Sequence, residues 1–181
     1  MKTKCRLCSA WELNSYVGSE VNNGKYIVIA QNPGKTEVQE NKPLIGKAGQ
    51  LWMNSINLVG LKRTDFNIYN TYKCYTMELV PNVYDKQAHK CIRYITEELR
   101  NDMNTIIWVM GKSAMELVNI HGNITDNAGK LFTCVFLERM WYVYVSEHPA
   151  HYLYNNNTDG FITRCLQFRE YVRQLAERRL G

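Results

Sequence analysis

The sequence predicts an α/β fold, a three-layer α/β/α sandwich built around a central, mainly parallel four-stranded sheet. Short runs of β-branched and aromatic residues recur along the chain, and longer segments with apolar residues at helical spacing lie between them. Strands that alternate with helices are typical of a parallel sheet covered on both faces. The chain has 181 residues, 45% of them hydrophobic, so we expect one core and a single domain over 1–181.

The first half of the chain carries two of the expected strands. A β-branched run at 25–30 leads into a Pro-Gly turn at 33–34, which suits a buried strand that ends in a tight loop. Apolar residues at helical spacing predict a helix over 48–59, which stops at Gly60. The next apolar run predicts a strand at 66–71. The loops after these strands are where α/β proteins place their sites.

The second half continues the alternation. Helical spacing at 86–101 precedes an apolar run at 105–110, which predicts a helix and then the third strand. A short helix at 113–120, a hairpin around 131–137 and a fourth strand at 141–145 follow. A long helix is expected at the C-terminus.

The charge balance permits a polyanionic partner. Lys and Arg outnumber Asp and Glu by 22 to 17, which gives a formal net charge of +5. A basic cluster near the C-terminus fits such a partner, but it fits a solvated helix face equally well. The sequence shows no apolar run resembling a secretory leader or a membrane span, so we expect a cytoplasmic protein with no membrane partner. One small domain needs no partner subunit, so we expect a monomer.

Four cysteines have a spacing that suits metal binding. Cys5 and Cys8 form a C-x2-C pair, Cys74 follows the second strand and Cys91 lies in the next helix. For a chain without a secretory leader, metal or redox roles are more natural than a disulfide framework. Spacing alone leaves open a zinc site, an iron-sulfur cluster, or a C-x-x-C pair beside unrelated buried thiols.

Six segments in a fixed order resemble one protein family. They are Cys5-Arg-Leu-Cys8, Ala30-Gln-Asn-Pro-Gly34, Lys42-Pro-Leu-Ile-Gly-Lys-Ala-Gly-Gln50, Ile68-Tyr-Asn-Thr-Tyr-Lys-Cys74, Cys91 and His148-Pro-Ala-His-Tyr-Leu153. Any one of these motifs alone is weak, but together they resemble the iron-sulfur uracil-DNA glycosylases, family four of that superfamily. The resemblance runs through almost the whole chain. It implies that Cys5, Cys8, Cys74 and Cys91 hold a [4Fe-4S] cluster with a structural role, while zinc on the same thiolates stays an alternative.

The resemblance also implies an activity and two residues that serve it. A family member hydrolyses the N-glycosidic bond of a flipped-out uracil in DNA and leaves an abasic site, the first step of base excision repair. By resemblance, His148 donates a hydrogen bond to the base O2 as negative charge develops, and Asn70 pairs with the uracil edge. From the residues alone, an ordinary loop histidine and an asparagine that caps a strand end compete with these roles.

The motif after the first strand departs from family four. The family has a glutamate followed by a small residue, whereas this chain has Gln31 and Asn32. The Asn-Pro-Gly order resembles the mismatch-specific and single-strand-selective branches, in which the asparagine orients the attacking water. An amide is no general base, but a well-placed water is enough if the base departs first. Gln31 is expected to contact the base or the water.

The residues expected at the base differ from the family in a way that predicts a wide pocket. Gly34 stands where the most uracil-strict branch has a tyrosine, so the pocket is expected to admit 5-substituted uracils. Leu44 replaces the phenylalanine that stacks on the base, and Trp52 or Tyr72 are candidates to compensate. Ala30, at the start of the motif, completes the expected base-binding set.

The segment after His148 is expected to contact DNA. His151, Tyr152 and Leu153 are candidates to fill the gap left by the flipped nucleotide, and Lys47 is a candidate for phosphate binding. Two alternatives stay open. One is a glycosylase for a modified or mismatched pyrimidine, and the other is a catalytically weak DNA-binding relative.

Overall fold

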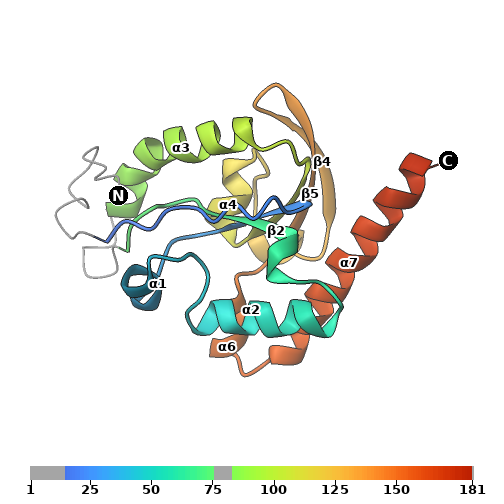
Figure 1. Ribbon diagram of the computed structural model, residues 1–181, viewed down its shortest axis with the longest axis horizontal. Coiled ribbons are helices and arrows are strands. Elements are labelled where there is room, and N and C mark those ends of the chain that lie inside the picture. The colour runs from blue at the N-terminus through green and yellow to red at the C-terminus, as the bar shows by residue number, and fades with distance from the viewer. Residues whose placement is uncertain (1–14, 76–82, 181) are drawn as a thin grey trace.

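A five-stranded sheet forms the centre of the protein. The computed structural model describes residues 15–75 and 83–180 (Figure 1). The strands, in the spatial order β2-β1-β3-β5-β4, are β1 (Tyr26–Ala30), β2 (Phe66–Asn70), β3 (Ile106–Met110), β4 (Leu131–Phe136) and β5 (Arg139–Ser146). Neighbouring strands are parallel except β4, which runs antiparallel to β5. The predicted count of four strands was one too low, because the segment expected as a hairpin pairs with β5 along its whole length.

Helices cover both faces of the sheet, as predicted. They are α1 (Lys35–Glu40), α2 (Lys47–Leu58), α3 (Val83–Asn101), α4 (Lys112–Leu117), α5 (Ile124–Asn127), α6 (Pro149–Tyr154) and α7 (Thr158–Leu180), with a 3-10 turn at Arg63–Asp65. In Figure 1, α3 and α4 lie on one side of the sheet, and α2, α6 and α7 on the other. No helix in the described part of the chain is long and apolar enough to cross a membrane.

Two hydrophobic cores, and not the single core expected from the chain length, result from the alternation of side chains along each strand. Val28 and Trp108 face the core formed with α2, α6 and α7, whereas Ile27 and Val109 face the core formed with α3 and α4. Because successive strand residues point to opposite faces, a strand that is apolar throughout must be covered on both sides. The two cores therefore fix the sheet rigidly, and with it the loops at its carboxyl edge.

The segment before β1 covers the outer edge of β2. Glu20 and Ile68 exchange backbone hydrogen bonds of 2.9 and 2.7 Å, and the N–H of Val17 donates to the carbonyl of Lys73 at 2.7 Å. Antiparallel bridges join Glu20 to Ile68 and Tyr16 to Cys74. The described chain therefore starts beside Cys74, where the loop after β2 begins.

Candidate active site

A cavity of about 320 Å³ lies at the carboxyl ends of β1 and β2. It brings together the turn after β1, the loop that leads into α2, the end of β2 and the start of α6. The lining residues are Gln31, Asn32, Gly34, Lys35, Thr36, Glu37, Leu44, Gly46, Lys47, Ala48, Asn70, Tyr75, His148 and Ala150. Seven of the residues that the sequence predicted for catalysis, base binding or phosphate binding are among them: Gln31, Asn32, Gly34, Leu44, Lys47, Asn70 and His148.

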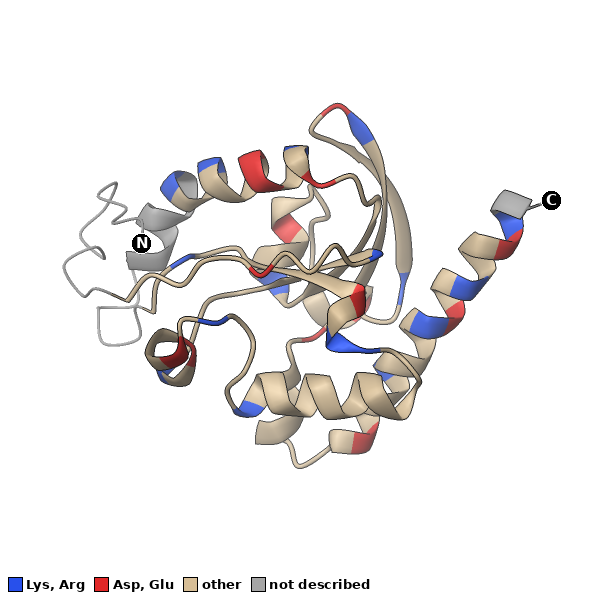
Figure 2. Cartoon of the chain, in the orientation of Figure 1, with Lys and Arg blue, Asp and Glu red and all other residues tan. Residues whose placement is uncertain are grey.

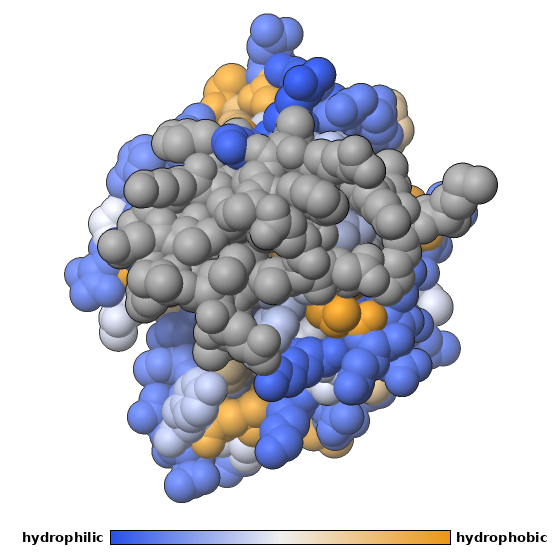
Figure 3. Space-filling model, turned by 90° about the vertical axis from the view of Figure 1, so that its left-hand side faces the viewer, coloured by the Kyte–Doolittle hydropathy of each residue, from blue (hydrophilic) through white to orange (hydrophobic). Residues whose placement is uncertain are grey.

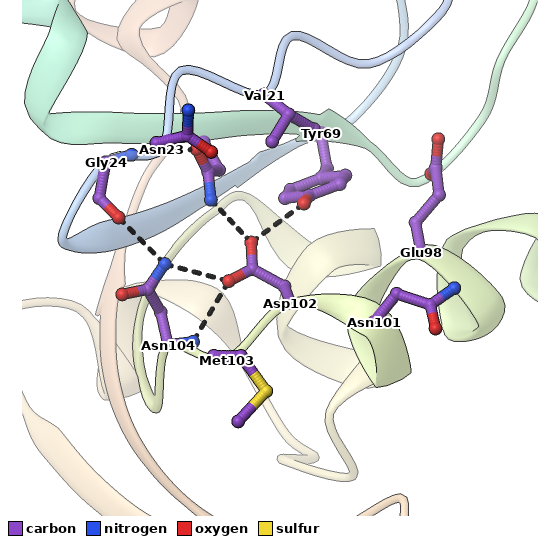
Figure 4. Close-up of a pocket in the computed structure, with 10 residues that line it drawn as sticks. Val21, Asn23, Gly24, Tyr69, Glu98, Asn101, Asp102, Met103 and Asn104 are labelled. Atoms are coloured by element: carbon purple, nitrogen blue, oxygen red, sulfur yellow. Dashed lines mark hydrogen bonds between the residues drawn. The ribbon is translucent and has the colours of Figure 1, made fainter.

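A second and larger cavity, of about 490 Å³, lies between β2 and the end of α3 (Figure 4). Asp102 lines this cavity, and its Oδ2 accepts hydrogen bonds from Asn67 Nδ2 at 2.7 Å and Tyr69 Oη at 2.8 Å. Its Oδ1 accepts from the backbone and side chain of Asn104 at 3.0 and 2.8 Å. Both carboxylate oxygens are thus engaged in holding the fold. We place the active site in the smaller cavity, because the unsatisfied Nδ2 of Asn70 and the predicted residues meet there.

His148 is held as a neutral hydrogen-bond donor. It caps α6, and its Nδ1 accepts the backbone N–H of Ala150 at 3.3 Å. Burial lowers the pKa of His148 to about 4, although the nearby charge of Glu37 acts in the opposite direction. The imidazole is therefore uncharged at neutral pH. Because Nδ1 accepts, the ring proton is on Nε2, which makes Nε2 the donor available to a ligand.

Asn70 presents a buried donor without a protein partner. Its side chain is 2% exposed at the end of β2, and its Nδ2 makes no hydrogen bond within the described structure. Leaving an amide N–H buried and unpaired costs about 1–3 kcal/mol, so such a group suggests a ligand that completes it. Asn70 also lines the cavity. The cavity thus contains a built-in site for a hydrogen-bond acceptor.

Asn32, in contrast to Asn70, offers a hydrogen-bond acceptor. Its Nδ2 donates to the carbonyl of Pro33 at 3.0 Å, which leaves the side-chain oxygen as an acceptor. Its neighbour Gln31 has an exposed side chain, and its carbonyl accepts the N–H of Tyr72 at 2.8 Å. An acceptor fixed in this way can orient a water molecule by taking one of its hydrogens.

Glu37 organises the cavity, a role that the sequence did not reveal. Its carboxylate is buried and accepts the backbone N–H groups of Gly34 at 3.0 Å, Ile45 at 3.0 Å and Gly46 at 2.7 Å. These bonds join the turn after β1 to the loop before α2. A side chain at Gly34 would place its Cβ 2.8 Å from Glu37 Oε2, so the glycine is required by the packing of this carboxylate as well as by the width of the pocket.

Two residues considered for the base-binding wall, Ala30 and Trp52, do not line the cavity. Ala30 does not line the cavity, because it is buried and its carbonyl accepts from Thr71 N and Oγ1 at 2.9 and 3.1 Å. Trp52 is fully buried against Phe66, with ring centroids 5.2 Å apart, so it cannot stack on a ligand. Tyr75 is instead the aromatic residue in the cavity lining.

Comparison with known proteins identifies the family. A family model described as the uracil DNA glycosylase superfamily matches residues 18–176, which is most of the chain. The chain belongs to this superfamily. The match includes the turn after β1, the end of β2 and the start of α6, which together form the cavity.

Individual members of the superfamily show the same relationship. The chain is 29% identical over 163 residues to a type-4 uracil-DNA glycosylase of Saccharolobus solfataricus, covering 84% of this chain and 74% of the relative. It is 27% identical over 164 residues to the type-4 enzyme of Sulfurisphaera tokodaii, covering 84% and 73%. The type-4 enzyme of Archaeoglobus fulgidus is 26% identical over 160 residues, covering 83% and 78%.

Within this superfamily member, the segment after His148 is partly buried. Tyr152 is 5% exposed, and its hydroxyl lies 2.5 Å from Glu147 Oε2 and 3.1 Å from Arg164 Nε. In this structure the Tyr152 side chain is therefore held inside the protein, and the expectation that it contacts DNA stays a prediction. His151 and Leu153 keep exposed surface, and neither lines the cavity. Tyr154, 85% exposed, is a large side chain that the sequence reading did not consider for this role.

The surroundings of the cavity are polar and partly basic. Lys47 starts α2 at the cavity mouth, where Figure 2 shows a basic residue at the first turn of the helix. On the face shown in Figure 3, the described surface is mainly hydrophilic, with separate apolar patches.

Two of the four predicted metal ligands lie in the described structure. Cys74 is buried after β2 and Cys91 is partly buried in α3, whereas Cys5 and Cys8 lie outside the described residues. Within 15–75 and 83–180 there is no group of three or more His, Cys, Asp or Glu side chains placed to hold a metal ion.

Proposed function

We propose that this member of the superfamily is a monofunctional uracil-DNA glycosylase of base excision repair. It hydrolyses the bond between a flipped-out uracil and its deoxyribose and leaves an abasic site in DNA. The observation that carries the proposal is the unsatisfied Nδ2 of Asn70 in the same cavity as the neutral donor His148. A pyrimidine with two carbonyl groups is a ligand that satisfies both donors.

Asn70 selects the base. Its Nδ2–H donates to the O4 of uracil, whereas cytosine presents an amino group at that position and offers no acceptor. Binding cytosine would keep the buried amide unpaired and bring two donors together. A site built to pair with one polar group rejects an analogue that lacks it far more strongly than an apolar pocket does.

His148 stabilises the leaving group. As the glycosidic bond breaks, negative charge develops on the base O2, and the Nε2–H of the neutral imidazole strengthens its hydrogen bond to this oxygen. The low pKa of His148 keeps the ring from binding a proton beforehand, so it acts as a fixed dipole. The enzyme therefore needs no protonated acid at neutral pH.

Asn32 positions the water. When the base leaves first, the sugar carries positive charge, and a water held by the Asn32 oxygen needs little activation to attack it. The proton of the water passes to solvent after the new bond has formed. Without a carboxylate at position 31 or 32, we expect slower catalysis than a site with a general base achieves.

Tyr75 is our candidate for the base-stacking side chain. It lines the cavity, and its backbone is held on both sides by Ser15, whose carbonyl accepts Tyr75 N at 3.2 Å and whose hydroxyl donates to Tyr75 O at 2.7 Å. Stacking of a base on an aromatic side chain contributes roughly 1–3 kcal/mol. Tyr75→Ala should therefore weaken substrate binding, while Tyr75→Phe should not.

The family resemblance leads us to propose a [4Fe-4S] cluster on Cys5, Cys8, Cys74 and Cys91. In support, Ser15 pairs with Tyr75, so the first segment leaves the described structure next to Cys74. Lys73, the residue before Cys74, pairs with Glu98 of α3, the helix that also carries Cys91. The cluster would cross-link the N-terminal segment to the loop after β2 and to α3. Iron and sulfide analysis of purified protein should give both elements, whereas zinc in their place would contradict the assignment.

The activity is tested with a labelled oligonucleotide that carries one uracil, treated with alkali after incubation. We expect strand scission by the wild type and strong loss in His148→Ala and Asn70→Ala. The matched control is His121→Ala, which removes an exposed histidine outside the cavity. Tight binding without scission would favour a DNA-binding relative that has lost catalysis.

A second candidate function is supported by the shape of the wall. Gly34 and the aliphatic Leu44 leave more room than an aromatic pair would, so a modified or mismatched pyrimidine is an alternative substrate. Oligonucleotides with uracil, thymine or hydroxymethyluracil separate the two. A clear preference for plain uracil would exclude this second candidate.

A further inference from the structure

The loop before α2 has a backbone conformation that requires outside support. Leu44 has φ +53°, in the left-handed region that a residue with a branched apolar side chain rarely adopts. It is nevertheless only 5% exposed and forms part of the cavity wall. Something must hold the peptide groups on either side of Leu44 in place.

Arg63 supplies that support from outside the cavity motifs. Its Nη2 donates to the carbonyl of Pro43 at 2.6 Å, and its Nη1 donates to the carbonyl of Leu44 at 2.8 Å. Glu20 fixes the guanidinium from behind, through contacts of 3.0 Å to Nε and 2.8 Å to Nη2. Burial alone would raise the pKa of Glu20, but hydrogen bonds from Arg63 and Asn22 outweigh it, so the pKa is lowered and the pair stays charged.

The other end of the same loop is held by an anion. Glu37 accepts the N–H groups of Ile45 and Gly46, which follow directly after Leu44. Two successive carbonyls therefore point to a cation and the next two N–H groups point to an anion. Both charged groups are well enclosed, since the Arg63 side chain is 12% exposed and Glu37 is 8% exposed.

Helix α2 also packs directly against the backbone of this loop. A Cβ at Gly49 would lie 2.2 Å from the carbonyl carbon and oxygen of Leu44, so only glycine allows this approach. The backbone of Leu44 is thus enclosed by a helix, a guanidinium and a carboxylate. No freedom remains for the wall to adapt unless one of these partners is removed.

We propose that Arg63 is a positioning residue for the base pocket: together with Glu37 it holds Leu44 in the left-handed conformation that shapes the wall facing the base. This inference rests on the proposed function, because it assumes that a base occupies the cavity. Arg63 does not line the cavity, so it acts only through the loop that it holds. A planar fork with several donors suits this task, and lysine offers no equivalent geometry.

The test measures the part of DNA affinity that depends on the base. Dissociation constants are compared for two oligonucleotides, one with an uncleavable 2′-fluorinated deoxyuridine and one with a tetrahydrofuran abasic analogue. The dissociation constant for the abasic analogue divided by that for the fluorinated oligonucleotide measures the contribution of base contacts. A general loss of folded protein changes both constants alike, so it leaves this ratio unchanged. We expect Arg63→Met to lower this ratio roughly tenfold, and Arg63→Lys to fall in between.

Arg139→Met is the matched control. Arg139 also donates to two backbone carbonyls, those of Asp102 at 2.7 Å and Leu99 at 3.1 Å, and it lies 3.8 Å above the ring of Trp141. It is not part of the cavity or of the contacts that hold it. The control should lose thermal stability while it keeps the wild-type ratio.

Each outcome has a distinct meaning. A folded Arg63→Met protein with the wild-type ratio would overturn the inference and leave the proposed function intact. If Arg63→Met does not fold, Glu20→Gln loosens the guanidinium more gently and must lower the ratio, or the inference fails. A wild-type protein that binds both oligonucleotides equally would overturn the proposed function and, with it, this role of Arg63.

Discussion

The carboxylate of Glu37 accepts the backbone N–H of Gly46 at 2.7 Å, and this contact links the two loops that form most of the cavity. One side chain thus sets the distance between the turn after β1 and the loop before α2. Because its other oxygen binds Gly34, a change at Glu37 must reach both loops at once.

Glu37→Gln should lower stability by about 1–3 kcal/mol, because an amide NH2 would face a backbone N–H that now has an acceptor. Catalysis should fall as well, since the two loops would separate. Urea unfolding and cleavage assays measure the two effects. Glu40→Gln, on an exposed position of the same helix, is the control and should change neither.

Gly34→Ala should reduce cleavage of uracil and of 5-substituted uracils to a similar extent. The added Cβ would meet Glu37 Oε2 at 2.8 Å and displace the carboxylate that supports the whole cavity. If the glycine serves only to leave room for a 5-substituent, the substitution should instead spare uracil. The ratio of cleavage rates for the two substrates decides between these explanations.

The low pKa of His148 predicts a particular dependence on pH. The folded-state value of about 4 lies below the ordinary value of 6.5, so the unfolded chain binds the extra proton first as the pH falls. The contribution of neutral His148 to stability is complete above about pH 6.5 and is lost as the pH falls towards 4. The ring retains some contact with water in the cavity, so we expect ~1–2 kcal/mol.

Urea unfolding of the wild type and of His148→Gln across this range measures that contribution, and the difference between the two proteins should shrink as the pH falls. The rate of base release should show no step near pH 6.5. A step there would mean that the imidazole titrates normally and that the site is more hydrated than its burial suggests.

Tyr152→Phe should cost about 1–2 kcal/mol of stability with little loss of cleavage, because its hydroxyl holds Glu147 and Arg164 in the interior. By contrast, Leu153→Ala and Tyr154→Ala should lower cleavage of double-stranded substrates more than of single-stranded ones. A side chain that fills the gap of a flipped nucleotide matters only where a partner strand keeps the stack closed. Equal losses on both substrates would argue against a wedge in α6.

The strands and several of the cavity-lining positions were predictable because their signals are local. β1 and β3 are short apolar runs buried on both faces, and the motifs around Asn32, Asn70 and His148 follow strand ends directly. Strand β4 was harder to predict. Its residues alternate between half-buried and exposed, a pattern that also fits a hairpin at the surface. Helices α1 and α6 have six residues each, too few to show a helical period.

The supporting contacts were not predictable, because they join residues that are distant in sequence. Arg63 reaches Leu44 across 19 positions, and nothing in the local pattern distinguishes it from an ordinary surface arginine. Tyr152 shows the reverse case, since its place in a DNA-contacting motif suggested exposure while Glu147 and Arg164 hold it inside. Tertiary packing decides such positions, and sequence spacing does not.

The antiparallel segment that pairs with β2 affects the tendency of the protein to associate with other chains. A sheet edge with free N–H and C=O groups is a template on which another extended chain can add. The bridge between Glu20 and Ile68 occupies this template with the protein's own chain. Any event that releases this segment would therefore expose a sheet edge that is prone to self-association.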